Sequence, residues 1–264
     1  MPLETHPLGP FSLRVWKEGT GAPLLYLHGF ETHPGDAGFL RRLAETHTVF
    51  APECPGYGQS TGATAVEDLL DLVLFYRELI NSWELTAPLD VIGHCFGGML
   101  AAELAALCPD KVNRLALIGS YGLWLDGVDA PDPFSLTPDE LRGAKWHDPE
   151  LAAMEPTITV PDPADPVAAT IERSLNLAVA AKLMWPLPDR GLRKRLHLVK
   201  APTLVVQGAS DGLVPRAHAE ELVRLIPQAR LVEVAAAGHL PHVEQEDATA
   251  AVLDAFFTPA LASS

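Results

Sequence analysis

Cys95 stands at the centre of residues 93–98, which read Gly-His-Cys-Phe-Gly-Gly. A cysteine thiolate is a strong nucleophile at neutral pH. Residues 88–93 predict a short buried strand, and residues 96–107, rich in Ala, Leu and Met, predict a helix. The thiol would then sit on a tight strand-to-helix turn, where the flanking glycines leave room for the backbone and the helix N-terminus stabilises negative charge. A buried, inert cysteine remains an equally good interpretation of this segment alone.

Asp211 and His239 are the residues that favour chemistry at Cys95. Asp211 follows a strand predicted at residues 203–206, and His239 follows a strand predicted at 230–234. An aspartate that accepts the imidazole N–H fixes the ring tautomer, and the imidazole can hold the thiol proton and later activate water. Another position for the acid, after the strand at 115–118, holds Gly119-Ser120, which favours Asp211.

Strands alternating with helices predict a mostly parallel sheet with right-handed crossovers. The expected strands are at 11–17 as an edge strand, 24–27, 48–51, 88–93, 115–118, 203–206 and 230–234; the expected helices are at 36–46, 66–82, 96–107, 218–226 and 243–257. Residues 122–195 lose this rhythm and gather prolines, acidic residues and tryptophans, which favours a helical cap over a disordered linker. We therefore predict a core of residues 1–121 and 196–264 with a cap at 122–195.

The chain resembles the α/β-hydrolase superfamily. The resemblance rests on four motifs in that family's order: His28-Gly29-Phe30, residues 93–98, residues 208–211, and Gly238-His239. It covers nearly the whole chain and implies the α/β-hydrolase fold, with the cap at its variable insertion. It also implies an oxyanion hole formed by the backbone N–H groups of Phe30 and Phe96.

The thiol departs from the usual serine of this superfamily. A Cys-His-Asp triad on this fold resembles the dienelactone hydrolases, and Gly-x-Cys-x-Gly-Gly resembles the polyhydroxyalkanoate synthases, but the layout is more similar to cap-bearing esterases and carbon–carbon bond hydrolases, which use serine. We expect a hydrolase that cleaves a carboxylic ester, lactone or thioester through a Cys95 acyl-enzyme. The alternatives are an acyltransferase, a serine hydrolase whose nucleophile was replaced by Cys, and a non-catalytic ligand-binding relative.

Several residues near these motifs are candidates for substrate contact: His28, Glu31, His94, Trp124, Trp146 and Trp185. We expect His94 to pack under the turn or touch substrate, Glu31 to face solvent, and His242 to be a surface or helix-capping group. The tryptophans, with Met184, either line an apolar pocket or hold the cap together.

The amino-acid composition limits which classes of molecule the protein can bind. The formal net charge of −15 argues against nucleic acid and anionic membranes. The three cysteines and ten histidines lack disulfide or metal-ligand spacing, so we expect neither a metal nor a cofactor. No targeting segment or membrane-spanning run is evident, and we expect a cytoplasmic protein. The expected partner is a small-molecule substrate with an apolar portion, and the oligomeric state stays open.

Overall fold

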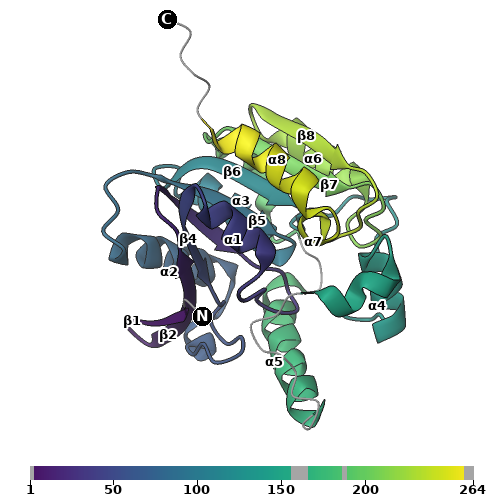
Figure 1. The fold of residues 1–264 in the computed structure, drawn as a ribbon, viewed down its shortest axis with the longest axis horizontal. Helices are drawn as coiled ribbons and strands as arrows, with labels where there is room; N and C mark the ends of the chain where they lie inside the picture. Colours follow the sequence, from purple (N-terminus) through teal and green to yellow (C-terminus); the bar gives the residue numbers. More distant parts are fainter. Residues whose placement is uncertain (1–2, 156–165, 186–188, 259–264) are drawn as a thin grey trace, which may run out of the picture.

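The computed structural model describes residues 3–155, 166–185 and 189–258. One sheet of eight strands has the order β1-β2-β4-β3-β5-β6-β7-β8 (Figure 1). The strands are β1 (Leu3–Leu8), β2 (Phe11–Glu18), β3 (Ala22–Leu27), β4 (His47–Pro52), β5 (Leu89–His94), β6 (Val112–Ile118), β7 (Thr203–Gly208) and β8 (Ala229–Val234). Only β2 pairs antiparallel, with β1 and β4; the remaining pairs are parallel. The predicted fold class, a mostly parallel sheet flanked by helices, is confirmed.

Helices cover both faces of the sheet. They are α1 (Gly38–Ala44), α2 (Leu69–Ser82), α3 (Phe96–Leu107), α6 (Arg216–Leu225), α7 (Pro241–Glu244) and α8 (Glu246–Phe257), with a short 3₁₀ turn η1 (Ala63–Ala65). Alternate side chains of β3 point into two separate cores: Leu25 and Leu27 pack with α2 and α3, whereas Leu24 and Tyr26 pack with α1 and α8. The sheet is therefore buried on both faces, which explains its nearly continuous apolar strands.

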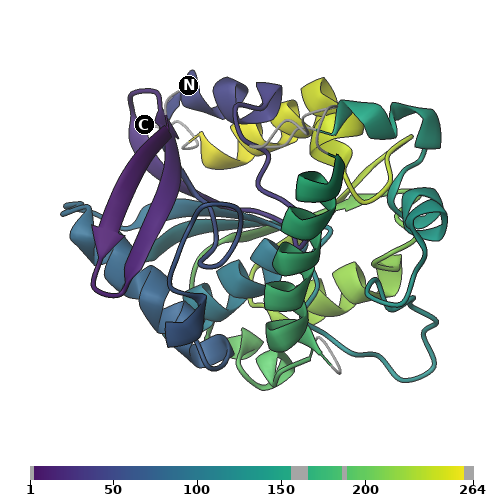
Figure 2. The same cartoon turned by 90° about the horizontal axis from the view of Figure 1, so that it is seen from below.

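A helical insertion separates β6 from β7. It contains α4 (Pro138–Lys145), η2 (Pro149–Met154), α5 (Pro166–Met184), η3 (Leu192–Lys194) and η4 (Leu196–Leu198). Thr137 and Glu140 form a capping box that starts α4. In Figure 2, α5 (green) runs down the middle of the view, from the helices that cover one face of the sheet toward those that cover the other. The insertion confirms the predicted helical cap, while the exact domain boundaries stay a prediction. None of the helices in the described ranges is long and apolar enough to cross a membrane.

The structure corrects three predicted elements. The polar lead forms β1, so β2 is an inner strand; β1 is held mainly by its backbone pairing and is only partly buried, which leaves a weak apolar pattern. The helix predicted at residues 66–82 begins later, at Leu69, because the Asp68 side chain caps α2 by accepting from the N–H groups of Leu70 and Asp71. The last predicted helix is broken at Gln245 into α7 and α8.

Candidate active site

Cys95 occupies a strained turn between β5 and α3. Its φ of 58° and ψ of −118° are unusual for a residue with a side chain. The backbone N–H of Cys95 donates to the carbonyl of Ile118 at 2.9 Å, which ties the turn to β6. A Cβ at Gly93 would lie 2.3 Å from the Gly97 carbonyl, and one at Gly97 would lie 2.1 Å from the Leu27 carbonyl. The strand and helix therefore approach this closely only because both positions are glycine.

Two backbone N–H groups beside Cys95 are available to a ligand. Phe96 is the first residue of α3, where an N–H has no partner within the helix. Within the described part of the chain, the N–H groups of Phe30 and Phe96 have no hydrogen-bond partner. The Phe30 loop is held in place by the Tyr57 hydroxyl, which donates to the Phe30 carbonyl at 2.9 Å. Asn176 of α5 also donates to the Glu31 carbonyl at 3.0 Å. Donors arranged in this way are suited to an oxyanion.

The structure brings Asp211 and His239 together. The distance from His239 Nδ1 to Asp211 Oδ2 is 2.9 Å, and both side chains are almost completely buried. The N–H groups of Leu213 and Val214 each donate to Asp211 Oδ1 at 2.9 Å, which orients the carboxylate. Because the carboxylate accepts from Nδ1, the other ring nitrogen, Nε2, is left for chemistry.

The electrostatics of His239 are set by burial and by two acidic neighbours. Burial alone lowers its pKa, but the charges of Asp211 and Cys95 outweigh this and raise the pKa to about 10. Its Nε2 atom is buried and has no hydrogen-bond partner among the described residues. At neutral pH such an imidazole is protonated.

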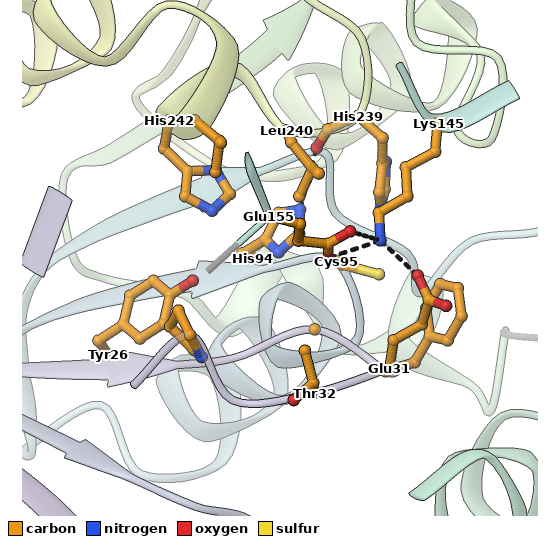
Figure 3. A pocket seen from close by; sticks show the side chains of 14 residues that line it. Tyr26, Glu31, Thr32, His94, Cys95, Lys145, Glu155, His239, Leu240 and His242 are labelled. Atoms are coloured by element: carbon orange, nitrogen blue, oxygen red, sulfur yellow. Dashed lines mark hydrogen bonds and ion pairs between the residues drawn. The ribbon is translucent and has the colours of Figure 1, made fainter. Parts of the chain in front are cut away.

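A small cavity of about 30 Å³, lined by both polar and apolar groups, opens at Cys95. Its lining residues are Tyr26, Gly29, Phe30, Glu31, Thr32, Pro34, His94, Cys95, Lys145, Glu155, His239, Leu240, His242 and Val243 (Figure 3). His94 therefore lies where substrate contact was expected, and burial together with the neighbouring imidazoles holds its pKa well below the usual value. His242 is a correction: expected at the surface, it is 4% exposed, and its ring centroid is 4.5 Å from that of His94. Burial lowers the pKa of His242 to about 3, so it is neutral.

Glu31 is a second correction. Expected to face solvent, it has a side chain only 16% exposed that forms an ion pair with Lys145 of α4 (Figure 3). Arg173 of α5 donates to the same carboxylate at 2.9 Å, and Lys145 also donates to Glu155 at 2.6 Å. Burial opposes the charge of Lys145, but the two carboxylates raise its pKa. The cap is thus joined to the Phe30 loop by charged side chains.

His28 and Trp146 do not line either cavity next to the candidate triad, contrary to expectation. The backbone N–H of Cys54 donates to His28 Nε2 at 2.9 Å, so Nδ1 carries the proton and donates to the Gly29 carbonyl at 2.8 Å. His28 therefore fixes the loops after β3 and β4. Trp146 is 3% exposed and caps the C-terminal end of α4. The backbone at this end of α4 packs closely against Gly238, because a Cβ at Gly238 would lie 2.4 Å from the Lys145 carbonyl.

A larger apolar cavity of about 250 Å³ lies between core and cap. Trp124 and Trp185 line it, as expected, with Met184. The remaining lining residues are Tyr121, Leu123, Ala130, Pro131, Asp132, Pro133, Phe134, Leu213, Val214 and His218. Tyr121 links this cavity to the candidate triad, since its ring centroid is 5.9 Å from that of His239 and its hydroxyl is buried without a partner in the described chain.

Sequence reasoning missed Lys145 and Tyr121. Lys145 lies in a strongly polar helix, and nothing in its neighbours signals a buried charge. Tyr121 follows directly after Gly119-Ser120 at the end of β6, at the same sheet edge as the other motifs. Its position there is the one signal that was available.

Comparison with known proteins shows the family of the chain. A model of the alpha/beta hydrolase family matches residues 24–252. The chain is 26% identical over 253 residues to Lipase 1 of Psychrobacter immobilis, covering 89% of this chain and 77% of the lipase. It is 30% identical over 249 residues to a pimeloyl-[acyl-carrier protein] methyl ester esterase of Aromatoleum aromaticum, covering 88% and 96% respectively. A membrane phospholipase A structure shares the fold, with a TM-score of 0.78, 23% identity and coverage of 97% of this chain and 86% of that one. The chain belongs to the alpha/beta hydrolase family and is an esterase- or lipase-like member of it.

Proposed function

We propose that this enzyme hydrolyses a carboxylic ester, lactone or thioester through an acyl-enzyme at Cys95. The observation that carries the proposal is the buried Asp211–His239 pair beside a thiol held on a strained turn. A purely binding pocket has no need for an oriented imidazole there. The lipase and the methyl ester esterase bear names of carboxylic ester hydrolases, and we extend that reaction class to this chain.

The first half-reaction forms a thioester. The Cys95 thiolate attacks the carbonyl carbon, and the new C–S bond displaces the carbonyl π electrons onto oxygen. The N–H groups of Phe30 and Phe96 would hold that oxyanion. When the C–O double bond re-forms, the C–O bond to the leaving alcohol breaks. His239 then supplies the proton from Nε2 to the departing oxygen.

The second half-reaction returns the enzyme to its starting state. His239, now neutral, takes a proton from water, and the hydroxyl attacks the thioester carbon. Collapse of this second tetrahedral intermediate breaks the C–S bond and releases the acid. The thiolate and the imidazolium are thereby restored. Asp211 stays ionised throughout and keeps the ring tautomer fixed.

Intact-mass spectrometry tests the proposal. The protein is mixed with a panel of one ester, one lactone and one thioester, then quenched in acid within the turnover time. We expect one acyl group per chain, located by peptide mapping at Cys95. Cys95→Ala should abolish both adduct and turnover.

Cys108→Ala is the matched control, since Cys108 is also a buried free thiol but lies at the far end of α3. It should label and turn over like the unmodified protein. Acylation elsewhere, or full turnover by Cys95→Ala, would refute the assignment. Added alcohol that diverts the product from acid to ester would point to acyl transfer.

A further inference from the structure

The two cavities beside the candidate triad differ in size and in chemistry. The one at Cys95 has room for about 30 Å³, and the one behind Tyr121 for about 250 Å³. Lining residues of the two cavities are in contact: Phe30 lines the small cavity and packs against Tyr121 and Phe134 of the large one, with ring centroids 6.3 and 5.8 Å apart. A group bonded to Cys95 is therefore within one side chain of both cavities.

The sizes limit what each cavity can accept. A buried water needs roughly 10–15 Å³, so the small cavity holds about two non-hydrogen atoms, the size of water or a one-carbon alcohol. A cavity of about 150 Å³ accommodates benzene, so the large one has room for roughly ten carbon atoms. A substrate that fills both cavities has one very small part and one long part.

The small cavity is lined by imidazole rings with nitrogen atoms that can pair with an O–H group. His94 Nε2 donates to the His239 carbonyl at 2.9 Å, so the neutral ring keeps its lone pair on Nδ1. That atom faces Gly29 beside the thiol, where a Cβ would lie 3.1 Å from it. His242 Nδ1 is also buried without a partner in the described ranges. An alkyl chain placed here would leave these atoms unsatisfied, whereas the O–H group of water or a small alcohol can both donate and accept.

The large cavity favours hydrocarbon. Its walls are mainly the side chains of Leu123, Trp124, Met184 and Leu213. No lysine or arginine lines it among the described residues, and the carboxylate of Asp132 would repel a charged acid. Burying an apolar chain against such walls is favourable, and each further CH₂ group removed from water adds to the gain.

Reaction chemistry decides which part of the substrate enters which cavity. Deacylation by water is the reverse of acylation by an alcohol, so water must attack from the place that the alcohol left. That place needs polar partners for the water and must be next to His239, and the small cavity meets both conditions. The acyl chain is left with the apolar cavity.

Building on the proposed function, we propose that the preferred substrates are esters of a long, uncharged apolar acid, of about eight to ten carbons, with a very small alcohol. The small cavity takes the alcohol and then the water. The large cavity takes the acyl chain, which passes the Phe30 and Tyr121 rings. An ester with the two parts exchanged has an alcohol too long for the small cavity and an acyl group that leaves the large cavity mostly empty.

A pair of isomers tests this directly. Methyl nonanoate and octyl acetate have the same atoms, with the long chain on the acid in one and on the alcohol in the other. We expect kcat/KM for methyl nonanoate to be at least about tenfold higher, because a single misplaced methylene already costs that much in a fitted pocket. An equal or reversed preference overturns the inference.

Filling the large cavity provides a second readout. Ala130 lines it and is only partly buried, so Ala130→Trp adds volume there without removing a core side chain. We expect this variant to lose at least about tenfold in kcat/KM on methyl nonanoate and to lose less on methyl acetate, whose acyl group is far shorter. Ala153→Trp, at an exposed cap position outside both cavities, is the matched control and should leave both rates unchanged.

The outcomes separate the two proposals. An enzyme that forms the Cys95 adduct but shows no isomer preference and no effect of Ala130→Trp refutes this inference alone. A protein that forms no adduct with any ester, lactone or thioester contradicts the proposed function, and this inference with it. The isomer comparison uses the unmodified protein and does not depend on the folding of a variant.

Discussion

Replacing Cys95 by serine should change which protonation state of His239 is active. In the native chain, burial lowers the pKa of His239, while the negative charges of Asp211 and Cys95 raise it to about 10. Serine does not ionise in this range, so Cys95→Ser removes one of the two charges that raise the pKa. An opposite charge at close range shifts a pKa by roughly one to three pH units. The pKa of His239 in the variant should fall by that amount.

The sign of the change distinguishes the two mechanisms. With a thiolate nucleophile, imidazolium is the active form because it protonates the leaving alcohol, so kcat/KM should hold through neutral pH and fall as pH rises through about 10. With a serine nucleophile, His239 must be neutral to take the hydroxyl proton. The activity of the variant should therefore rise with pH through the lowered pKa.

The assay is kcat/KM for methyl nonanoate from pH 5 to pH 11, alongside ultraviolet absorbance of the thiolate in the native protein. Cys108→Ser serves as the control and should leave the profile unchanged. Superimposable profiles for native protein and Cys95→Ser would refute the ion-pair reasoning. A variant that is much faster than the native protein would indicate a site adapted to serine.

Three further predictions concern other buried groups. Asp211→Asn should lower kcat by about 10⁴-fold in a pre-steady-state assay, because the amide no longer fixes the His239 tautomer; a loss under tenfold would contradict its orienting role. His28 is held neutral by burial, with its pKa lowered to about 4, so the stability it contributes is present above pH 6.5 and lost as pH falls toward 4. Urea unfolding should show a loss of about 2 kcal/mol from this group between pH 7 and pH 5, and His28→Gln should lessen the pH dependence; an unchanged slope would count against it. Tyr121→Phe removes a buried hydroxyl that lacks a partner, so the free energy of unfolding should rise by about 1 kcal/mol in urea titrations, and a decrease would show that the hydroxyl is satisfied.

The turn at Cys95 could be predicted because it depends on residues that are neighbours in the sequence. The helix predicted at residues 96–107 coincides with α3, since an unbroken apolar run after a glycine-flanked turn has few other conformations. The glycines at positions 93 and 97 were assigned to close backbone approach, and the contacts that a Cβ would make there agree. Such features depend on residues close in the sequence.

Contacts between distant residues could not be predicted in the same way. Lys145 and Glu31 are 114 positions apart, and their pairing depends on how the cap closes over the Phe30 loop. His242 was expected at the surface because helix starts are usually exposed, yet α7 packs it against His94 beside the pocket. A polar residue in a short helix carries no periodic signal of its burial.

By itself, the sequence determined the alternation of strands and helices, the turn that carries Cys95, and the order of the motifs around it. Tertiary structure decided that the predicted pair of Asp211 and His239 is buried, that His28 and Trp146 line neither cavity, and that a small cavity at the thiol lies near a larger apolar one. The physical reason is how far apart in the sequence the residues lie that set each property. Backbone dihedrals and hydrophobic periodicity are local properties of the chain, whereas cavity shape, burial and pKa depend on side chains brought together from far apart in the sequence.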